Sequence, residues 1–264
     1  MPELTIKEIG RILADSVNLE TQIVCVYGSE RIPESGVRTS SISGCLASAM
    51  YQMATGKICG PLYAGYEQDQ SFCRCMGGPA WFGYRSFDHG LMSLLASGSE
   101  DLKGFVPKRL KKSREIAQKT ISSIGKVVPL GRYVVMSRCE GLQDDRGVRC
   151  LVCFASGEQI RNLCALAHFA SSDVFNLVSI PRGPSCATMI TYPAGMAENA
   201  PPDMLFVGPS DPSASFWLPK GVFGDRNFRE DGQDDGRMRK AVFSCRYCLV
   251  LPKCVIKWQL LNSS

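Results

Sequence analysis

The first apolar residues of the chain recur at helical spacing, and the next apolar run has the composition of a strand. Four residues define the helical stripe: Ile6, Ile9, Leu13 and Val17. Thr5 and Glu8 give this stripe the Thr-x-x-Glu form of a capping box, so the pattern predicts an amphipathic helix over 6–17. The β-branched run TQIVCVYG at 21–28 ends at a glycine, which is typical of a buried strand.

Further helices are expected in the first half of the chain. The segment CLASAMYQMATG at 45–56 has a helical pattern that stops at Gly56, a residue type favoured just past a helix end. Another helical stretch lies within 79–97, around LMSLLAS. A helix at 107–123 is rich in lysine and arginine, and Pro107 suits its first turn.

After Val127 the pattern changes to strands with one clear helix. Strand-like runs occur at 131–138, 148–156 and 204–208, and again in the tail after 240. The SGEQ sequence at 156–159 is a second capping box. One helical face follows it: Ile160, Leu163, Cys164 and Ala167. The sequence therefore predicts that Ser156 begins a helix that packs on the preceding strand.

These elements predict an α+β fold, with a mixed sheet and flanking helices in a single compact domain over 1–264. The 264 residues are enough to bury a sizeable core. We expect the core at 20–210, the basic helix at about 107–123, and a divergent cysteine-containing tail at 225–264. A domain boundary near 100–127 is the alternative.

Composition places the chain among ordinary globular proteins and guides how its cysteines are interpreted. Apolar residues make up 45% and charged residues 21%, and no apolar run is long enough to span a bilayer. The N-terminus carries charges throughout and lacks the apolar region of a signal peptide. We therefore expect a cytoplasmic protein without a membrane partner. In that reducing compartment the 13 cysteines are read as buried thiols, metal ligands or redox groups rather than as a disulfide framework.

Positive charge is concentrated in one segment. The net charge is +5, and eight lysines and arginines lie between Lys103 and Lys126 against a single acid, Glu115. A stripe of this kind suits an anionic cofactor, nucleic acid or an acidic partner, and more often it is simply the solvated face of a helix. No nucleic-acid-binding motif accompanies it, so no specific nucleic-acid partner is expected.

Four cysteines near glycine-rich turns form the first candidate site: Cys45, Cys59, Cys73 and Cys75. Thiolates from helix ends and glycine-rich loops can surround an iron–sulfur cluster or zinc. Gly77 and Gly78, which follow the Cys-x-Cys pair, allow the backbone to approach such a centre or a cofactor closely. The pair could also cycle as a dithiol, and buried thiols in a tightly turned core are the structural alternative.

A second candidate is Cys186, which follows Gly-Pro-Ser in a turn that could open a helix at Ser185. A thiol at a helix N-terminus has a lowered pKa, which favours a nucleophile or a metal ligand. A nucleophile needs a base. Of the two histidines, His89 is the better partner because Asp88 adjoins it, whereas His168 lies on the helix after the 148–156 strand.

The tail supplies a third candidate, Cys245-x-x-Cys248, with Cys254 further on. This spacing is half of a metal site, and the second half is missing. Within a strand it places the two thiols on opposite faces. Packing is therefore the preferred interpretation unless a distant cysteine joins the pair. Walker A, dinucleotide-binding, His-Glu-x-x-His and Gly-x-Ser-x-Gly motifs do not occur.

The sequence resembles the domain-of-unknown-function-169 (ArCR) family of prokaryotic proteins, which are frequent in archaea and anaerobic bacteria. The resemblance covers roughly 20–210. The matching positions are Cys45, Cys73 or Cys75 with Gly77 and Gly78, Glu158 with Gln159, and Ser185 with Cys186 and Ala187. It implies a fold and candidate positions but no reaction, because the family's activity is unassigned. The basic, cysteine-bearing tail departs from the family pattern, so the resemblance implies no role for its cysteines.

Three functions follow as hypotheses. The first is a metal or iron–sulfur centre held by the clustered cysteines and used in redox or cofactor chemistry. The second is a metal-free small-molecule or cofactor-binding module, in which the turns at 77–78 and 183–186 face one pocket. The third is a thiol-nucleophile enzyme that uses Cys186 and His89. Convergence of three sulfurs would favour the first, and an exposed thiol beside a base would favour the third. The oligomeric state stays open.

Overall fold

The computed structural model describes residues 4–42, 45–65, 77–97, 110–142, 147–169, 171–181, 183–201, 204–208 and 243–248. Its strands are β1 (Val24–Ser29), β2 (Val37–Arg38), β3 (Leu62–Gly65), β4 (Tyr133–Arg138), β5 (Val148–Ala155), β6 (Val178–Ser179), β7 (Leu205–Gly208) and β8 (Phe243–Cys248). They form one eight-stranded sheet in the order β2-β3-β4-β1-β5-β8-β7-β6. The two outer pairs, β2 with β3 and β6 with β7, are parallel, and the others are antiparallel. The sheet is thus mixed, as the sequence predicts.

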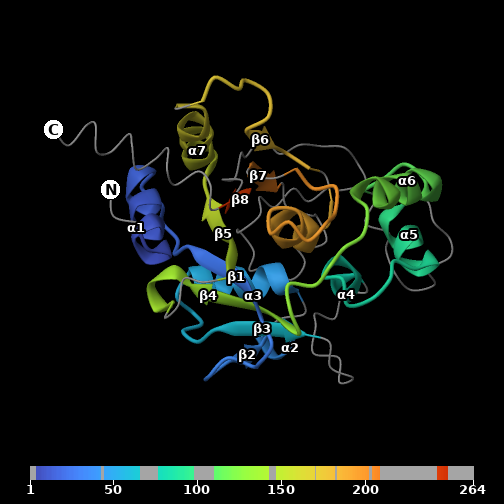
Figure 1. The fold of residues 1–264 in the computed structure, drawn as a ribbon, viewed down its shortest axis with the longest axis horizontal. Coiled ribbons are helices and arrows are strands. Elements are labelled where there is room, and N and C mark those ends of the chain that lie inside the picture. Colours follow the sequence, from blue (N-terminus) through green and yellow to red (C-terminus); the bar gives the residue numbers. More distant parts are fainter. Residues whose placement is uncertain are drawn as a thin grey trace, which may run out of the picture.

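Helices cover both faces of this sheet (Figure 1). They are α1 (Ile6–Ser16), α2 (Thr39–Ile42), α3 (Leu46–Ala54), α4 (Gly78–Trp81), α5 (His89–Leu95), α6 (Arg114–Ile124) and α7 (Gly157–Phe169), with a 3₁₀ turn η1 (Cys139–Gly141) and a π-helical turn η2 (Ala187–Thr191). Figure 1 shows α1 and α7 on one side and α4, α5 and α6 on the other. Helices around a mixed sheet confirm the predicted α+β class, whereas the single domain over 1–264 stays a prediction. None of the helices within the described ranges has the length and apolar character needed to cross a membrane.

The central strand β5 separates two buried clusters. Its residues alternate between them, because successive side chains of a strand point to opposite faces. Val152 and Phe154 belong to the larger cluster, with α3 to α6 and η2. Leu151 and Ala155 belong to the smaller one, with α1 and α7. The predicted central position of this strand is confirmed, since β1 pairs with one edge and β8 with the other.

Both predicted capping boxes are present. The Glu8 N–H donates to Thr5 Oγ1 at 3.2 Å and the Thr5 N–H donates to Glu8 Oε2 at 2.8 Å, at the start of α1. Two backbone donors that a helix start leaves unpaired are thus satisfied by side chains. Each helix begins at the residue after its predicted cap, so these boundaries are confirmed.

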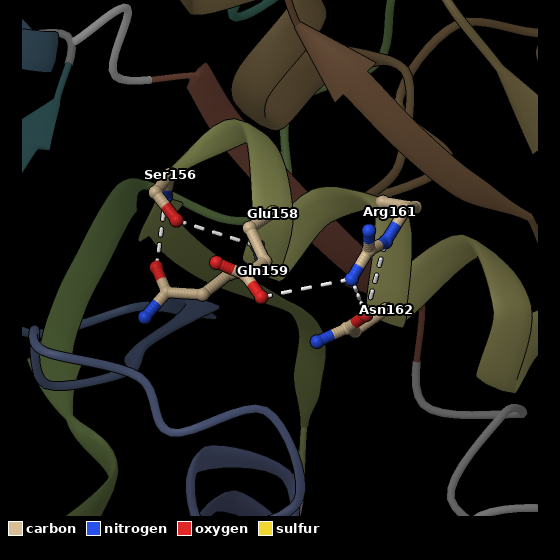
Figure 2. Close-up of polar contacts among 5 residues, drawn as sticks. All are labelled: Ser156, Glu158, Gln159, Arg161 and Asn162. Atoms are coloured by element: carbon tan, nitrogen blue, oxygen red, sulfur yellow. Dashed lines mark hydrogen bonds and ion pairs between the residues drawn. The ribbon is translucent and has the colours of Figure 1, made fainter.

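The box at α7 also fixes the helix to the rest of the fold. Figure 2 shows the reciprocal bonds, in which the Ser156 N–H donates to Gln159 Oε1 at 2.8 Å and the Gln159 N–H donates to Ser156 Oγ at 3.3 Å. Gln159 is buried and its Nε2 donates to the Asn18 carbonyl at 2.5 Å. Behind it Leu163 is fully buried against β5. The Gln159 position that resembles the family pattern therefore has a structural role.

The predicted start of the basic helix is wrong. Helix α6 begins at Arg114, and Ser113 caps it by accepting a hydrogen bond from the Ile116 N–H at 3.3 Å. The chain just before it is extended, because the N–H of Lys111 donates to the Leu95 carbonyl at the end of α5. This hydrogen bond to a distant element keeps Lys111 out of the helix, so the helix begins later than the sequence predicts. Pro107 itself lies outside the described residues.

The described lysines agree with a solvated face. Lys112 and Lys119 are exposed and Lys111 is half-buried, while Lys108 lies outside the described residues. Lys119 pairs with Glu115 at 2.7 Å, and both side chains are largely exposed. An exposed pair of this kind contributes little stability.

Candidate functional site

The glycine-rich turn after the Cys-x-Cys pair leads directly into a short helix. Gly77 precedes α4 with a φ of −93°, and Pro79 occupies its first turn. Cys73 and Cys75 lie outside the described residues, so their part in any site stays a prediction. The first described element after them ends at Trp81, whose side chain is 2% exposed. The turn therefore delivers a large aromatic ring into the core.

The second predicted stretch also forms a helical segment. Ser185 and Cys186 are helical and run into η2, which confirms the predicted helix opening at Ser185. Within η2 the backbone bonds widen to the five-residue spacing: the Tyr192 N–H donates to the Ala187 carbonyl at 3.0 Å. Such π-helical turns occur often at functional sites. Ser185 is buried, and Cys186 is half-buried against the larger cluster.

These two stretches meet at what we call the α4–η2 junction, formed by Trp81, Thr191 and Tyr192. Thr191 Oγ1 donates to the Trp81 carbonyl at 2.5 Å. The Trp81 and Tyr192 rings meet edge to face, with centroids 6.2 Å apart. Phe87 approaches Trp81 in the same manner at 4.9 Å. Each aromatic pair adds roughly 0.5–1.5 kcal/mol beyond its buried area, so the junction is a rigid contact between distant segments.

Both glycine turns border the junction. A Cβ added to Gly77 would lie 3.3 Å from Trp81 Nε1. One added to Gly183 would lie 3.7 Å from the Tyr192 hydroxyl. The same Cβ positions would lie 3.0 Å from Leu91 Cδ1 and 3.4 Å from Thr188 Cγ2, so the absence of side chains at these glycines lets the neighbouring chains pack closely around the two aromatic rings. Gly77 and Gly183 thus lie beside the same aromatic pair, and the hypothesis that the 77–78 and 183–186 turns face one pocket stays a prediction.

The indole nitrogen of Trp81 is the unusual feature of the junction. It is buried, and it has no hydrogen-bond partner in the part of the chain that the structure describes. A buried donor without an acceptor costs about 1–3 kcal/mol, and buried polar groups are nearly always paired in native proteins. Trp81 Nε1 is therefore a donor placed where an acceptor is expected.

The described cysteines of the first candidate set lie in different environments. Cys45 precedes α3 and is half-buried against the larger cluster, to which Cys186 also packs. Cys59 is exposed, and its carbonyl accepts a bond from Arg138 at 3.4 Å. No group of three potential metal ligands occurs among the described side chains. A centre that includes Cys73 and Cys75 stays a prediction.

His89 is the first residue of α5 and is exposed. The carboxylate of the neighbouring Asp88 has two other partners. One oxygen accepts a hydrogen bond from the Leu91 N–H at 2.8 Å, and the other forms an ion pair with Arg85 at 3.3 Å. Asp88 thus acts as a helix cap, not as the carboxylate that would orient an imidazole. The pairing of His89 with Cys186 stays a prediction. His168 Nδ1 lies 2.8 Å from the Cys164 carbonyl on its own helix.

Several other cysteines pack as small apolar residues. Cys25, Cys139, Cys150 and Cys153 are buried. Gly10 approaches Cys139 closely, since an added Cβ would lie 3.2 Å from its Sγ. Burial raises the pKa of the Cys153 thiol far above its usual range, and Cys139 adds to the effect. The Cys153 thiol is therefore neutral and unreactive while the core stays closed.

Sequence reasoning named the cysteines and glycines of the junction and missed its aromatic and hydroxyl members. Trp81 stands four residues after Gly77, and Thr191 and Tyr192 stand five and six residues after Cys186. An aromatic ring beside glycine turns was an available signal, but it also fits ordinary core packing. Only the fold distinguishes the two cases.

Comparisons with known proteins agree with this description at the level of the family. The family model named DUF169, described as uncharacterised ArCR, matches residues 12–223. No curated protein and no solved structure matches the chain. Because the family model covers most of its length, the chain belongs to the DUF169 family.

Proposed function

We propose that this protein binds a small molecule or cofactor at the α4–η2 junction. The observation that supports the proposal is the buried, unpartnered N–H of Trp81. A ligand that carries a hydrogen-bond acceptor would satisfy this donor and remove its cost. The acceptor would enter beside Gly77, which has no side chain next to Trp81 Nε1, and the flexible end of Leu91, 3.0 Å from the Gly77 Cβ position, would move aside.

The surroundings define the ligand's chemistry. Phe87 and Tyr192 place aromatic edges around Trp81, so the part of the ligand that enters is apolar or aromatic apart from its acceptor. Thr191 is held by its bond to the Trp81 carbonyl and fixes η2 against α4. The two segments that would hold the ligand are thus already fixed to each other, which lowers the entropic cost of binding.

A metal or iron–sulfur centre is the second proposal. It is supported by the packing of Cys45 and Cys186 against the same core cluster as Trp81. Cys73 and Cys75 precede Gly77 by four and two residues in the sequence. Together these residues would supply the thiolates that zinc or a cluster needs. Redox or cofactor chemistry would then follow from the centre.

Anaerobic purification separates the two proposals. Native mass spectrometry, absorption spectroscopy and metal analysis would be applied to the wild type, Trp81→Phe and a Cys73→Ser/Cys75→Ser variant. An organic ligand lost from Trp81→Phe but retained by the cysteine variant supports the first proposal. Iron or zinc in stoichiometric amount, lost only from the cysteine variant, supports the second.

A panel of common cofactors tests the first proposal when nothing copurifies. The panel would contain flavins, nicotinamide and adenine nucleotides, folates and pterins, with melting temperature as the readout. A compound that stabilises the wild type should bind Trp81→Phe roughly tenfold more weakly, the effect of one lost hydrogen bond. Equal binding by both proteins would contradict the site, and absence of any binder from the whole panel would count against it.

A further inference from the structure

The pairing of β5 with β8 brings distant cysteines together. The two strands are antiparallel, and two of their six register pairs join cysteine to cysteine. Cys150 stands opposite Cys248, and Cys153 stands opposite Cys245. We call these four residues the β5–β8 cysteine ladder. Each cysteine of the Cys-x-x-Cys pair in the tail therefore lies opposite one cysteine of β5.

The backbone spacing at these positions matches a disulfide. Directly opposite residues of an antiparallel pair have Cα atoms about 4.5 or about 5.5 Å apart, in alternation. Disulfides span Cα separations of about 4.4–6.8 Å. The two pairs are three positions apart along the strands, so one falls at a narrow position and one at a wide position. Both lie within the disulfide range.

The ladder cannot form a single four-sulfur site. Cys150 lies on the face of the larger cluster and Cys153 on the face of the smaller one. Residues opposite each other across a sheet share a face, so with this register a bond at each pair would form on the face of the β5 cysteine. Four thiolates around one metal require one common face. The register thus favours two separate pairs over a metal centre.

We propose that the β5–β8 cysteine ladder is a redox latch, in which oxidation by a low-molecular-weight disulfide forms Cys150–Cys248 and Cys153–Cys245 bonds and locks β8 to the sheet. This inference is independent of the proposed ligand site. It assigns the tail cysteines a role that neither packing nor metal binding provides.

The reaction is thiol–disulfide exchange. One cysteine of a pair loses its proton and attacks the small disulfide, which forms a mixed disulfide and releases one small thiolate. The opposite cysteine then loses its proton and attacks the protein sulfur, which releases the second small thiolate. The two released thiolates take up the two protons. Each pair is thereby oxidised by two electrons, and one small disulfide is reduced to two thiols.

Burial determines when the latch closes. Cys150 is fully buried and Cys153 is 1% exposed, and only the thiolate is an effective nucleophile. Attack therefore waits for local separation of β8 from β5. Once a pair has formed its bond, that separation is blocked. Strand β8 is the element whose opening the latch controls.

Disulfide mapping by mass spectrometry tests the proposal on the full chain. The protein would be incubated with oxidised glutathione, alkylated under denaturing conditions and cleaved with trypsin. Cleavage beside arginine and lysine separates Cys245, in the peptide 241–246, from Cys248, in the peptide 247–253, and leaves Cys150 with Cys153 in 150–161. We expect the 150–161 peptide to be linked to both tail peptides, with the links lost on treatment with a dithiol.

Single substitutions assign the bonds. Cys248→Ser should remove the link to 247–253 and retain the link to 241–246, and Cys245→Ser should do the reverse. Cys164→Ser is the matched control, because Cys164 is on α7 outside the ladder, and it should leave both links intact. Exposed Cys59 should form a mixed disulfide with glutathione in every variant, which shows that the reagent is active.

The same incubation in denaturant below the unfolding transition gives the decisive result, because it raises the frequency of local opening. Links between 150–161 and both tail peptides under either condition support the latch. Modification of Cys59 without either link under both conditions overturns it. Links from the tail to other cysteines would overturn the register on which it rests.

Discussion

Replacing Trp81 by phenylalanine separates a ligand site from ordinary core packing. The substitution keeps a ring in the core and removes the indole N–H. Full removal of a buried tryptophan to alanine costs about 3–5 kcal/mol, and we expect the smaller truncation to cost about 1–2 kcal/mol. The unpaired N–H already costs the ligand-free protein about 1–3 kcal/mol. The two effects oppose each other, so the free energy of unfolding should fall by no more than about 1 kcal/mol and could rise by up to about 2 kcal/mol.

The measurement is urea unfolding of the ligand-free protein, followed by circular dichroism, with a constant denaturant slope required for comparison. Phe82→Leu is the matched control, because Phe82 is fully buried beside Trp81 and carries no polar side-chain atom. It should lose about 1–2 kcal/mol without compensation. Should Trp81→Phe lose more than about 3 kcal/mol, its N–H is hydrogen-bonded in the free protein and the argument for the site fails.

Four further outcomes are expected. Gly77→Ala, at a φ that alanine tolerates, should place a methyl group against Trp81 Nε1 and weaken ligand binding at least tenfold in a titration, whereas Gly141→Ala, with open space around it, should not. Ser156→Ala should cost about 1 kcal/mol of unfolding free energy in urea, and a value near zero would refute its capping role. In time-resolved alkylation exposed Cys59 should react at once, and Cys153 should react only when β8 separates from β5 or when the whole chain unfolds. Since burial raises the pKa of Cys153, the unfolded state loses that proton first, and stability should fall as the pH rises above about 8.5.

Local signals in the sequence were sufficient for several element boundaries. The capping boxes at Thr5 and Ser156 each act over three residues, so the donors and acceptors that decide the helix start are close together in the chain. The composition of β5 likewise suits burial on both faces. In these cases the surroundings reinforce a preference that already exists locally, which is why prediction from the sequence succeeds.

The start of α6 shows where local reasoning fails. Pro107 and the following lysines have intrinsic preferences that favour a helix, yet the backbone N–H of Lys111 donates its hydrogen bond to the Leu95 carbonyl. A hydrogen bond to another element competes directly with the helical one for the same N–H group. Nothing in the 107–113 segment encodes the position of α5. Helix propensity is a weak preference that tertiary contacts override.

The candidate site is hidden from the sequence for the same reason. The bond from Thr191 to Trp81 joins residues 110 positions apart. The π-helical spacing of η2 places Thr191 and Tyr192 on a different face from the one they would occupy in an α-helix, and no pattern in the sequence predicts that change. The sequence could show that glycine turns occur at both places. It could not show that a buried N–H would stand between them without an acceptor.

The cysteine ladder depends on register, which is a property of two strands together. Strand β5 contains Cys150-x-x-Cys153, and β8 contains the same spacing as Cys245-x-x-Cys248. Antiparallel pairing reverses direction, so matching Cys150 to Cys248 places Cys153 opposite Cys245 as well. A slip of one residue would move every side chain of β8 to the other face and separate both pairs. The two disulfide links therefore test the β5–β8 register together. Both are expected in the observed register, and neither is expected if β8 is shifted by one residue.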